Sequence, residues 1–126
     1  MKKILIVDDE PDYLRLLHLR LSGFGYAVVT IDNGNNILVT ARNTKPDLIV
    51  LDINISEVNG FEVYRLLRRD SGLSHIPVIF SSADASHYGS FQRNEYPNAL
   101  FLAKPFGNEE ILEAIAKLAS NPPSRR

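Results

Sequence analysis

Short, wholly apolar runs recur along the chain, and segments with helical spacing separate them. Residues 4–7 and 48–51 are apolar at every position, which is typical of strands buried on both faces of a sheet. Similar strand-like stretches occupy residues 26–31, 77–80 and 99–103. A strand that hides both of its faces needs a layer of helices on each side, so these runs restrict the chain to a layered α/β architecture.

Apolar residues recur at helical spacing between the predicted strands. The first helix is predicted to begin at Pro11, which suits the first helical turn, and to end at Gly23. We expect Gly60 to begin another helix and Asn108 to cap the last one. The predicted inward positions are Leu14, Leu17, His18 and Leu21 in the first helix, Ile37, Leu38 and Ala41 in the second, Val63, Tyr64, Leu66 and Leu67 in the third, and Ile111, Leu112, Ile115 and Leu118 in the last. Residues 84–97 lack a regular period, and only a short or mobile helix is expected there.

This alternation of strands and helices predicts the overall fold. It favours a doubly wound sheet of five parallel strands with helices on both faces, the (βα)5 flavodoxin-like arrangement. A length of 126 residues suits one domain, which we place at residues 1–119. Residues 120–126 are expected to form a flexible tail or linker remnant, because Pro122 and Pro123 cannot continue a helix.

Composition excludes several classes of function. The chain has no cysteine, which excludes disulfides, thiolate nucleophiles and cysteine-ligated zinc. Its 14 basic and 15 acidic residues argue against a protein that binds nucleic acid through bulk positive charge. No apolar run approaches the roughly 20 residues that cross a bilayer, and no signal-peptide pattern is visible. We therefore expect a cytoplasmic protein that contacts neither membrane nor nucleic acid directly.

Polar residues follow the predicted strands at the points where these strands end. Asp8 and Asp9 follow the first strand, Asp52 the third, Ser82 the fourth and Lys104 the last. The carboxyl ends of parallel strands share one edge of a sheet, so these side chains should converge there. Crowded carboxylates repel one another unless a cation neutralises them, and oxygen ligands suit Mg²⁺. A carboxylate in this setting can attack phosphorus, while a hydroxyl and an ammonium accept the phosphoryl charge.

Several motifs stand in a characteristic order and at characteristic intervals. They are ILIVDDEP at 4–11, LIVLD at 48–52, Asn59-Gly60, PVIFSSA at 77–83 and Lys104-Pro105-Phe106. Together they make residues 2–119 resemble the receiver domains of the bacterial response-regulator family, of the chemotaxis type.

The resemblance implies a role for each residue at the strand ends. Asp52 would accept a phosphoryl group, and Asp8 and Asp9 would hold Mg²⁺ together with Asp52. Ser82 would bind the phosphoryl group and Lys104 would be its cationic partner. Family spacing favours Ser82 over its neighbour Ser81, and strand alternation puts the two serines on opposite faces.

The resemblance also implies two residues beyond this set. Asn54, two positions after the acceptor, would give its backbone carbonyl to the metal. Phe101, three positions before the lysine, would be the aromatic switch residue that rotates inward on phosphorylation. Ser56 stands where the family often has a proline, and residues 84–97 lack the family's usual amphipathic helix.

The resemblance implies a phosphoacceptor of a two-component phosphorelay. Its phosphoryl group would come from a sensor histidine kinase or a histidine phosphotransfer protein, and phosphorylation would switch binding to an unidentified downstream protein. It would not be an enzyme beyond catalysing its own phosphorylation and autodephosphorylation, and Mg²⁺ would be its only cofactor. A homodimer is left open, as is the choice between a stand-alone receiver and a piece of a longer protein.

Two alternatives stay open. The first is a degenerate receiver that acts as a constitutive protein-interaction domain. The second is a phosphatase of the haloacid-dehalogenase type, because residues 48–56 resemble its Asp-x-Asp-x-Thr loop with Asn54 in place of the second aspartate.

Other features have ordinary structural interpretations. Arg65, Arg68 and Arg69 are expected to form a solvated helix end rather than a docking patch. Tyr88, Phe91 and Tyr96 are expected to cover the sheet edge rather than to form a partner surface.

Overall fold

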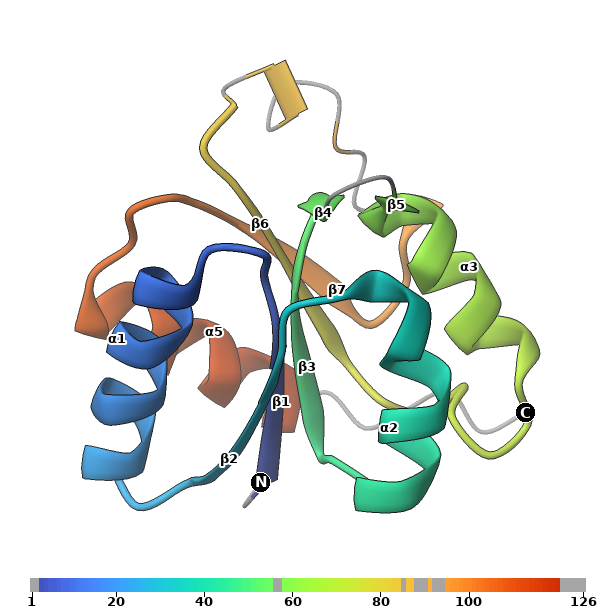
Figure 1. Cartoon of the computed structure of the whole chain (residues 1–126), viewed down its shortest axis with the longest axis horizontal. Helices are drawn as coiled ribbons and strands as arrows, with labels where there is room; N and C mark the ends of the chain where they lie inside the picture. The colour runs from blue at the N-terminus through green and yellow to red at the C-terminus, as the bar shows by residue number, and fades with distance from the viewer. Residues whose placement is uncertain (1–2, 56–57, 85, 88–90, 92–94, 121–126) are drawn as a thin grey trace.

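The computed structural model describes residues 3–55, 58–84, 86–87, 91 and 95–120. A parallel five-stranded sheet, in the order β2-β1-β3-β6-β7, forms its centre (Figure 1). The strands are β1 (Lys3–Val7), β2 (Ala27–Ile31), β3 (Leu48–Asp52), β6 (Val78–Ser82) and β7 (Ala99–Ala103). The predicted fold class and each predicted strand are confirmed.

Helices cover both faces of the sheet. They are α1 (Pro11–Gly23), α2 (Ile37–Thr44), α3 (Gly60–Arg69) and α5 (Asn108–Ser120), with a short 3₁₀ helix η1 (Gly34–Asn36) before α2. In Figure 1, α1 and α5 lie on one side of the sheet, and α2 and α3 lie on the other. Among the described residues, no helix is long and apolar enough to cross a membrane.

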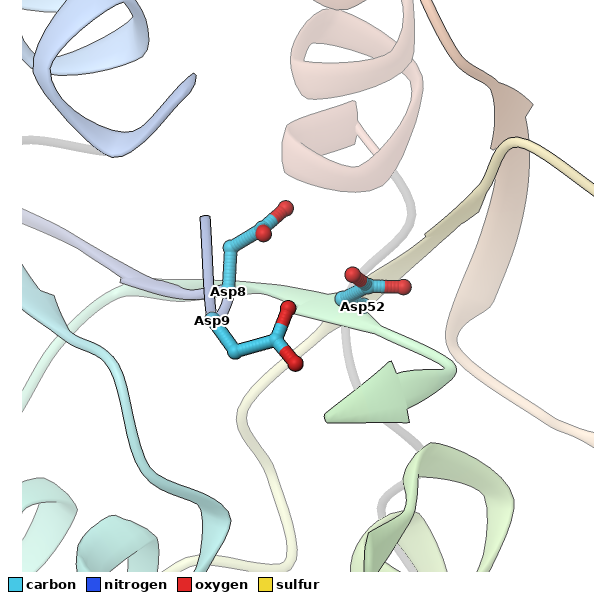
Figure 2. Close-up of side chains that lie close together, drawn as sticks. All are labelled: Asp8, Asp9 and Asp52. Atoms are coloured by element: carbon cyan, nitrogen blue, oxygen red, sulfur yellow. The ribbon is translucent and has the colours of Figure 1, made fainter. Parts of the chain in front are cut away.

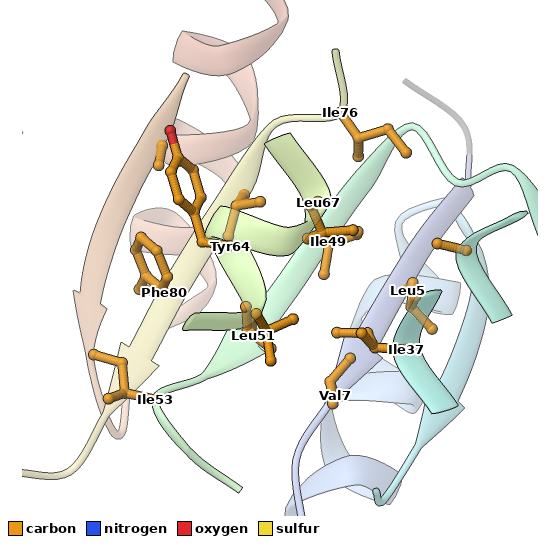
Figure 3. Packing of buried hydrophobic residues seen from close by; sticks show 14 of the residues in the cluster. Leu5, Val7, Ile37, Ile49, Leu51, Ile53, Tyr64, Leu67, Ile76 and Phe80 are labelled. Atoms are coloured by element: carbon orange, nitrogen blue, oxygen red, sulfur yellow. The ribbon is translucent and has the colours of Figure 1, made fainter. Parts of the chain in front are cut away.

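Alternate residues of each strand enter two separate hydrophobic clusters. In β1, Ile4 and Ile6 pack with α1 and α5, whereas Leu5 and Val7 pack with α2 and α3. Figure 3 shows the second of these clusters. Both faces of the central strands are therefore buried, which is the physical reason why the apolar runs in the sequence are continuous.

The helices differ from the sequence prediction at a few positions. His18 on α1 and Leu66 on α3 were predicted to face inward, but both are exposed, because each lies beyond the edge of the apolar stripe of its helix. Leu112 is only partly buried. The helix α5 already includes Asn108, and the N–H of Gly107 donates to Glu110 Oε1 at 2.8 Å, so the cap lies one residue earlier than predicted.

Some features were not predicted at all. A small antiparallel pair, β4 (Asn54–Ile55) and β5 (Val58–Asn59), follows β3. Some predictions concern positions outside the described residues. These positions are Ser56, Tyr88, residues 121–126 and about half of 84–97.

Arg68 is not simply solvated, contrary to the prediction for the end of α3. Its guanidinium donates to the carbonyl oxygens of Ile76 at 2.8 Å and of Pro97 and Asn98 at 3.3 Å. It also lies 4.4 Å from the ring centre of Tyr64. Arg68 therefore ties α3 to the segments that precede β6 and β7.

The aromatic residues after β6 pack against the sheet as predicted. Tyr96 is buried, and Phe91 packs against the same hydrophobic cluster. Their rings stack on each other, with centroids 5.6 Å apart. Both therefore contribute to the core at this edge of the sheet.

Candidate phosphoryl-acceptor site

The strands bring their polar terminal residues to one edge of the sheet. Asp8 follows β1, Asp52 ends β3, Ser82 ends β6 and Lys104 follows β7. β1 and β3 are neighbours in the sheet, and the helices that follow them, α1 and α3, cover opposite faces of it (Figure 1). This is the point at which open α/β sheets place their ligands.

Three carboxylates gather at this edge. Oxygen atoms of Asp8, Asp9 and Asp52 all lie within 4.8 Å of one another. Figure 2 shows these carboxylates directed into a common space, with Asp8 and Asp9 on the loop after β1. Asp8 and Asp52 are buried, whereas Asp9 is exposed. An all-oxygen donor set with one member open to solvent fits a hard divalent cation that keeps part of its water shell.

Lys104 reaches into the same cluster. Its Nζ lies 2.6 Å from Asp8 Oδ2, 3.0 Å from Asp52 Oδ2 and 3.7 Å from Glu10 Oε1. The ring centre of Tyr13 lies 4.6 Å from the same nitrogen. Only 9% of the lysine side chain is exposed, so these ion pairs are poorly screened by water. One ammonium faces more than one carboxylate, and the cluster keeps an excess of negative charge.

The electrostatics of Asp52 and Lys104 follow from this imbalance. Burial raises the pKa of the Asp52 carboxyl, and repulsion from Asp8 adds to the effect although Lys104 opposes it. Burial alone would lower the pKa of the Lys104 ammonium, but its hydrogen bonds to Asp8 and Asp52 outweigh burial and raise the pKa. Lys104 therefore remains a cation while Asp52 is a carboxylate whose charge is only partly compensated.

Backbone groups orient the two buried carboxylates. The N–H of Glu10 donates to Asp8 Oδ1 at 3.0 Å, and the N–H of Asn54 donates to Asp52 Oδ1 at 3.1 Å. Asn54 therefore contacts Asp52 through its N–H, and the predicted role of its backbone carbonyl as a metal ligand stays a prediction. The second oxygen of each aspartate, Oδ2, contacts Lys104 Nζ.

The start of α3 packs directly against the backbone of Asp52. The N–H of Gly60 donates to Ile53 O at 2.7 Å, and a Cβ atom at Gly60 would lie only 2.7 Å from Asp52 O. Asn59 caps the helix by accepting the N–H of Phe61 on its side-chain oxygen at 2.8 Å. The Asn59-Gly60 motif thus positions the loop that follows Asp52.

Ser82 ends β6 at the same edge of the sheet, and its hydroxyl contacts residues outside the carboxylate cluster. It is 2% exposed, its Oγ accepts the N–H of Asp84 at 3.0 Å, and this oxygen lies 2.8 Å from Nδ1 of His87. Its carbonyl accepts the N–H of Lys104 at 2.9 Å, which links the ends of β6 and β7. Ser81 is equally buried and is the residue in register with Asp52.

Phe101 is buried in the core in this structure. It lies in register with Phe80 and is 9% exposed. Its ring centre is 5.7 Å from that of Phe91. The side chain predicted to move inward on phosphorylation is therefore already packed against the sheet.

Sequence reasoning missed Tyr13 and His87. Tyr13 lies three residues after Glu10, so helical spacing could have placed it above the strand ends. His87 falls in a segment whose sequence has no regular period, and no signal in the sequence pointed to its contact with Ser82.

Comparison with known proteins places these features in context. The sequence model of the family described as "Response regulator receiver domain" matches residues 4–116. The chain is 33% identical over 115 residues to Protein PilH of Pseudomonas aeruginosa, with 91% of this chain and 95% of PilH covered. It is 31% identical over 121 residues to the DNA-binding response regulator MtrA of Mycolicibacterium smegmatis, which covers 95% of this chain but 52% of MtrA. The chain thus spans about half of the length of that relative, and 45% of the length of PhoP of Bacillus subtilis.

Solved structures show the same fold. The response regulator TrrA of Thermotoga maritima, solved in complex with Mg²⁺-BeF, has a TM-score of 0.80 and 33% identity, and covers 94% of this chain and 99% of its own. The chemotaxis response regulator CheY4 of Vibrio cholerae has a TM-score of 0.82 and 26% identity, with 94% and 98% covered.

Proposed function

This chain belongs to the family of response regulator receiver domains, and we propose that it accepts a phosphoryl group on Asp52. The observation that carries the proposal is the position of Asp52, a buried carboxylate held between the Lys104 ammonium and the carboxylates of Asp8 and Asp9. The receiver domain is a signalling module, and the proposed catalysis is limited to its own phosphorylation and autodephosphorylation.

The proposed step is a displacement at phosphorus. An oxygen of the Asp52 carboxylate forms a bond to phosphorus, and the bond from phosphorus to the donor atom breaks. The electron pair of the broken bond leaves with the donor, which is an imidazole in a phosphohistidine or an acetate in acetyl phosphate. Lys104 and the Ser82 hydroxyl would bind the phosphoryl oxygens, so the chain contributes positioning and charge rather than a base.

Mg²⁺ fits the donor set at this edge. We propose that Asp8, Asp9, Asp52 and the backbone carbonyl of Asn54 hold it, because carboxylate and carbonyl oxygens are the ligands this cation prefers. When bound, it would neutralise charge on the carboxylates and on the phosphoryl oxygens. The structure of the relative TrrA in complex with Mg²⁺-BeF supports the choice of metal.

The source and the readout of the signal are further parts of the proposal. Receiver domains interact with histidine kinases and downstream targets, so the phosphoryl group is proposed to come from a sensor histidine kinase or a histidine phosphotransfer protein. Ser82 and Phe101 would pass its arrival to an unidentified protein partner. We further propose a cytoplasmic protein that contacts neither nucleic acid nor membrane directly. The proposal also keeps one domain at residues 1–119 and a tail at 120–126.

Intact mass measurement tests the function. Incubation with acetyl phosphate and Mg²⁺ is expected to add one phosphoryl group to the wild-type chain and none to Asp52→Asn. A degenerate receiver would stay unlabelled in both chains. Equal labelling of both chains would place the acceptor elsewhere and contradict the proposal.

A further inference from the structure

The Ser82 hydroxyl already has hydrogen-bond partners before any phosphoryl group arrives. Its Oγ accepts the N–H of Asp84 at 3.0 Å and lies 2.8 Å from His87 Nδ1. The N–H of His87 donates to Asp84 O at 3.1 Å, so a tight turn after β6 brings the imidazole over the serine. Ser82 is almost fully buried and His87 is half-buried, so the contact is partly shielded from water.

A hydroxyl group has one hydrogen to donate and two lone pairs that accept. The N–H of Asp84 uses one of the lone pairs of Ser82. When His87 Nδ1 accepts, the hydroxyl hydrogen is directed at the imidazole. A phosphoryl oxygen on Asp52 is itself an acceptor, so it needs that same hydrogen. In this tautomer of His87, the imidazole and the phosphoryl group compete for a single donor.

We propose that His87 is a positioning residue that holds the Ser82 hydroxyl and competes with the phosphoryl group for it. The inference rests on the proposed phosphorylation of Asp52. Phosphorylation must break the contact between Ser82 and His87. The cost of breaking this hydrogen bond slows labelling of the wild-type chain by about fivefold, the rate equivalent of a typical net hydrogen-bond energy. His87 thereby sets how readily this receiver is phosphorylated.

The test compares variants in their rate of labelling by acetyl phosphate and Mg²⁺. His87→Phe keeps an aromatic ring without the nitrogen and is expected to be labelled about fivefold faster than wild type. His87→Asn keeps a hydrogen-bonding atom near the place of Nδ1 and is expected to return the rate to near the wild-type value. His75→Phe is the matched control, because His75 is exposed and precedes β6 at the opposite end of that strand.

A second background separates the proposed competition from a merely structural effect. In a Ser82→Ala chain the contact no longer exists, so His87→Phe is expected to change the labelling rate less than about twofold. An equal acceleration in both backgrounds, or no acceleration in the wild-type background, would overturn the inference. Thermal unfolding checks that each variant folds, and His87→Ala replaces His87→Phe if the latter does not. Failure of wild type to be labelled on Asp52 would instead overturn the proposed function.

Discussion

At the scale of single residues, the site depends on one lysine shared among several carboxylates. Lys104 Nζ contacts the carboxylates of Asp8, Asp52 and Glu10. The residues of this cluster were predicted from the sequence because each follows an apolar run, and strand ends are easy to locate. Its details were not predictable, because the contacts of Tyr13 and His87 depend on how a helix and a turn lie over the strand ends.

The unbalanced charge at Asp52 predicts a stability change. Because the folded-state pKa of Asp52 is raised, the stability that its protonated form contributes is fully present below the unfolded pKa and is lost as pH rises through the folded pKa. Near neutral pH without metal, Asp52→Asn is therefore expected to melt higher than wild type, by roughly 2–6 °C. The difference should shrink as the pH falls toward the ordinary value of 3.8.

The measurement is thermal unfolding of wild type and Asp52→Asn in EDTA, once near neutral pH and once near the ordinary pKa value of 3.8. Asp12→Asn is the control, because the Asp12 side chain is 98% exposed and its ion pair with Arg15 contributes little. A lower melting temperature for Asp52→Asn than for wild type near neutral pH would show that the pairing with Lys104 outweighs burial and repulsion.

Tyr13 gives a second prediction at this scale. Its hydroxyl is buried and has no hydrogen-bond partner among the residues that the structure describes, and burial raises its pKa to about 12. Tyr13→Phe removes this unsatisfied group and keeps the ring beside Lys104, so the free energy of unfolding is expected to rise by about 1 kcal/mol. Urea denaturation measures the change.

Tyr64→Phe is the matched control for this substitution. The Tyr64 hydroxyl donates to Pro97 O at 2.5 Å, so its removal is expected to lower the free energy of unfolding by about 1 kcal/mol. Loss of stability in Tyr13→Phe as well would mean that the Tyr13 hydroxyl makes a favourable contact.

At the scale of elements, the strands and helices were largely predictable and their connections were not. Continuous apolar runs identified β1, β3 and β6 because those strands are buried on both faces. The pair β4 and β5 escaped prediction because strands of two residues have no period to read. Arg68 was misjudged because its partners are carbonyl oxygens of segments distant in sequence.

The close contact between α3 and the end of β3 leaves no room for a methyl group at Gly60. Gly60→Ala would place its Cβ 2.7 Å from Asp52 O and 2.8 Å from Ile53 Cα, both of which belong to the backbone and cannot swing aside. We expect a loss of about 1–3 kcal/mol in the free energy of unfolding and slower labelling of Asp52. Gly23→Ala is the control, because nothing lies within 4 Å of a Cβ at that position.

Denaturant unfolding and the labelling assay are to be run on both glycine variants. Gly23→Ala is expected to leave stability and labelling close to wild type. A Gly60→Ala chain that unfolds and labels like wild type would mean that α3 does not fix the position of the loop after Asp52.

At the scale of the whole molecule, the sheet order places the acidic cluster, the lysine and the serine at one edge although they lie far apart in sequence. Parallel strands with helical crossovers end at the same edge, so the fold class was sufficient to predict that these residues converge. The two hydrophobic clusters give this edge a rigid base on both faces of the sheet. The central claim is that, of the three carboxylates at this edge, Asp52 accepts the phosphoryl group and Asp8 and Asp9 do not.

Locating the phosphoryl group tests that claim most directly. Treatment of the acetyl-phosphate-labelled chain with borohydride reduces an aspartyl phosphate to homoserine, and peptide mass mapping finds the reduced residue. The account predicts homoserine at position 52, with Asp8 and Asp9 unchanged, and none at any position in Asp52→Asn. Homoserine at position 8 or 9, or a label on the wild-type chain that borohydride does not convert, would contradict it.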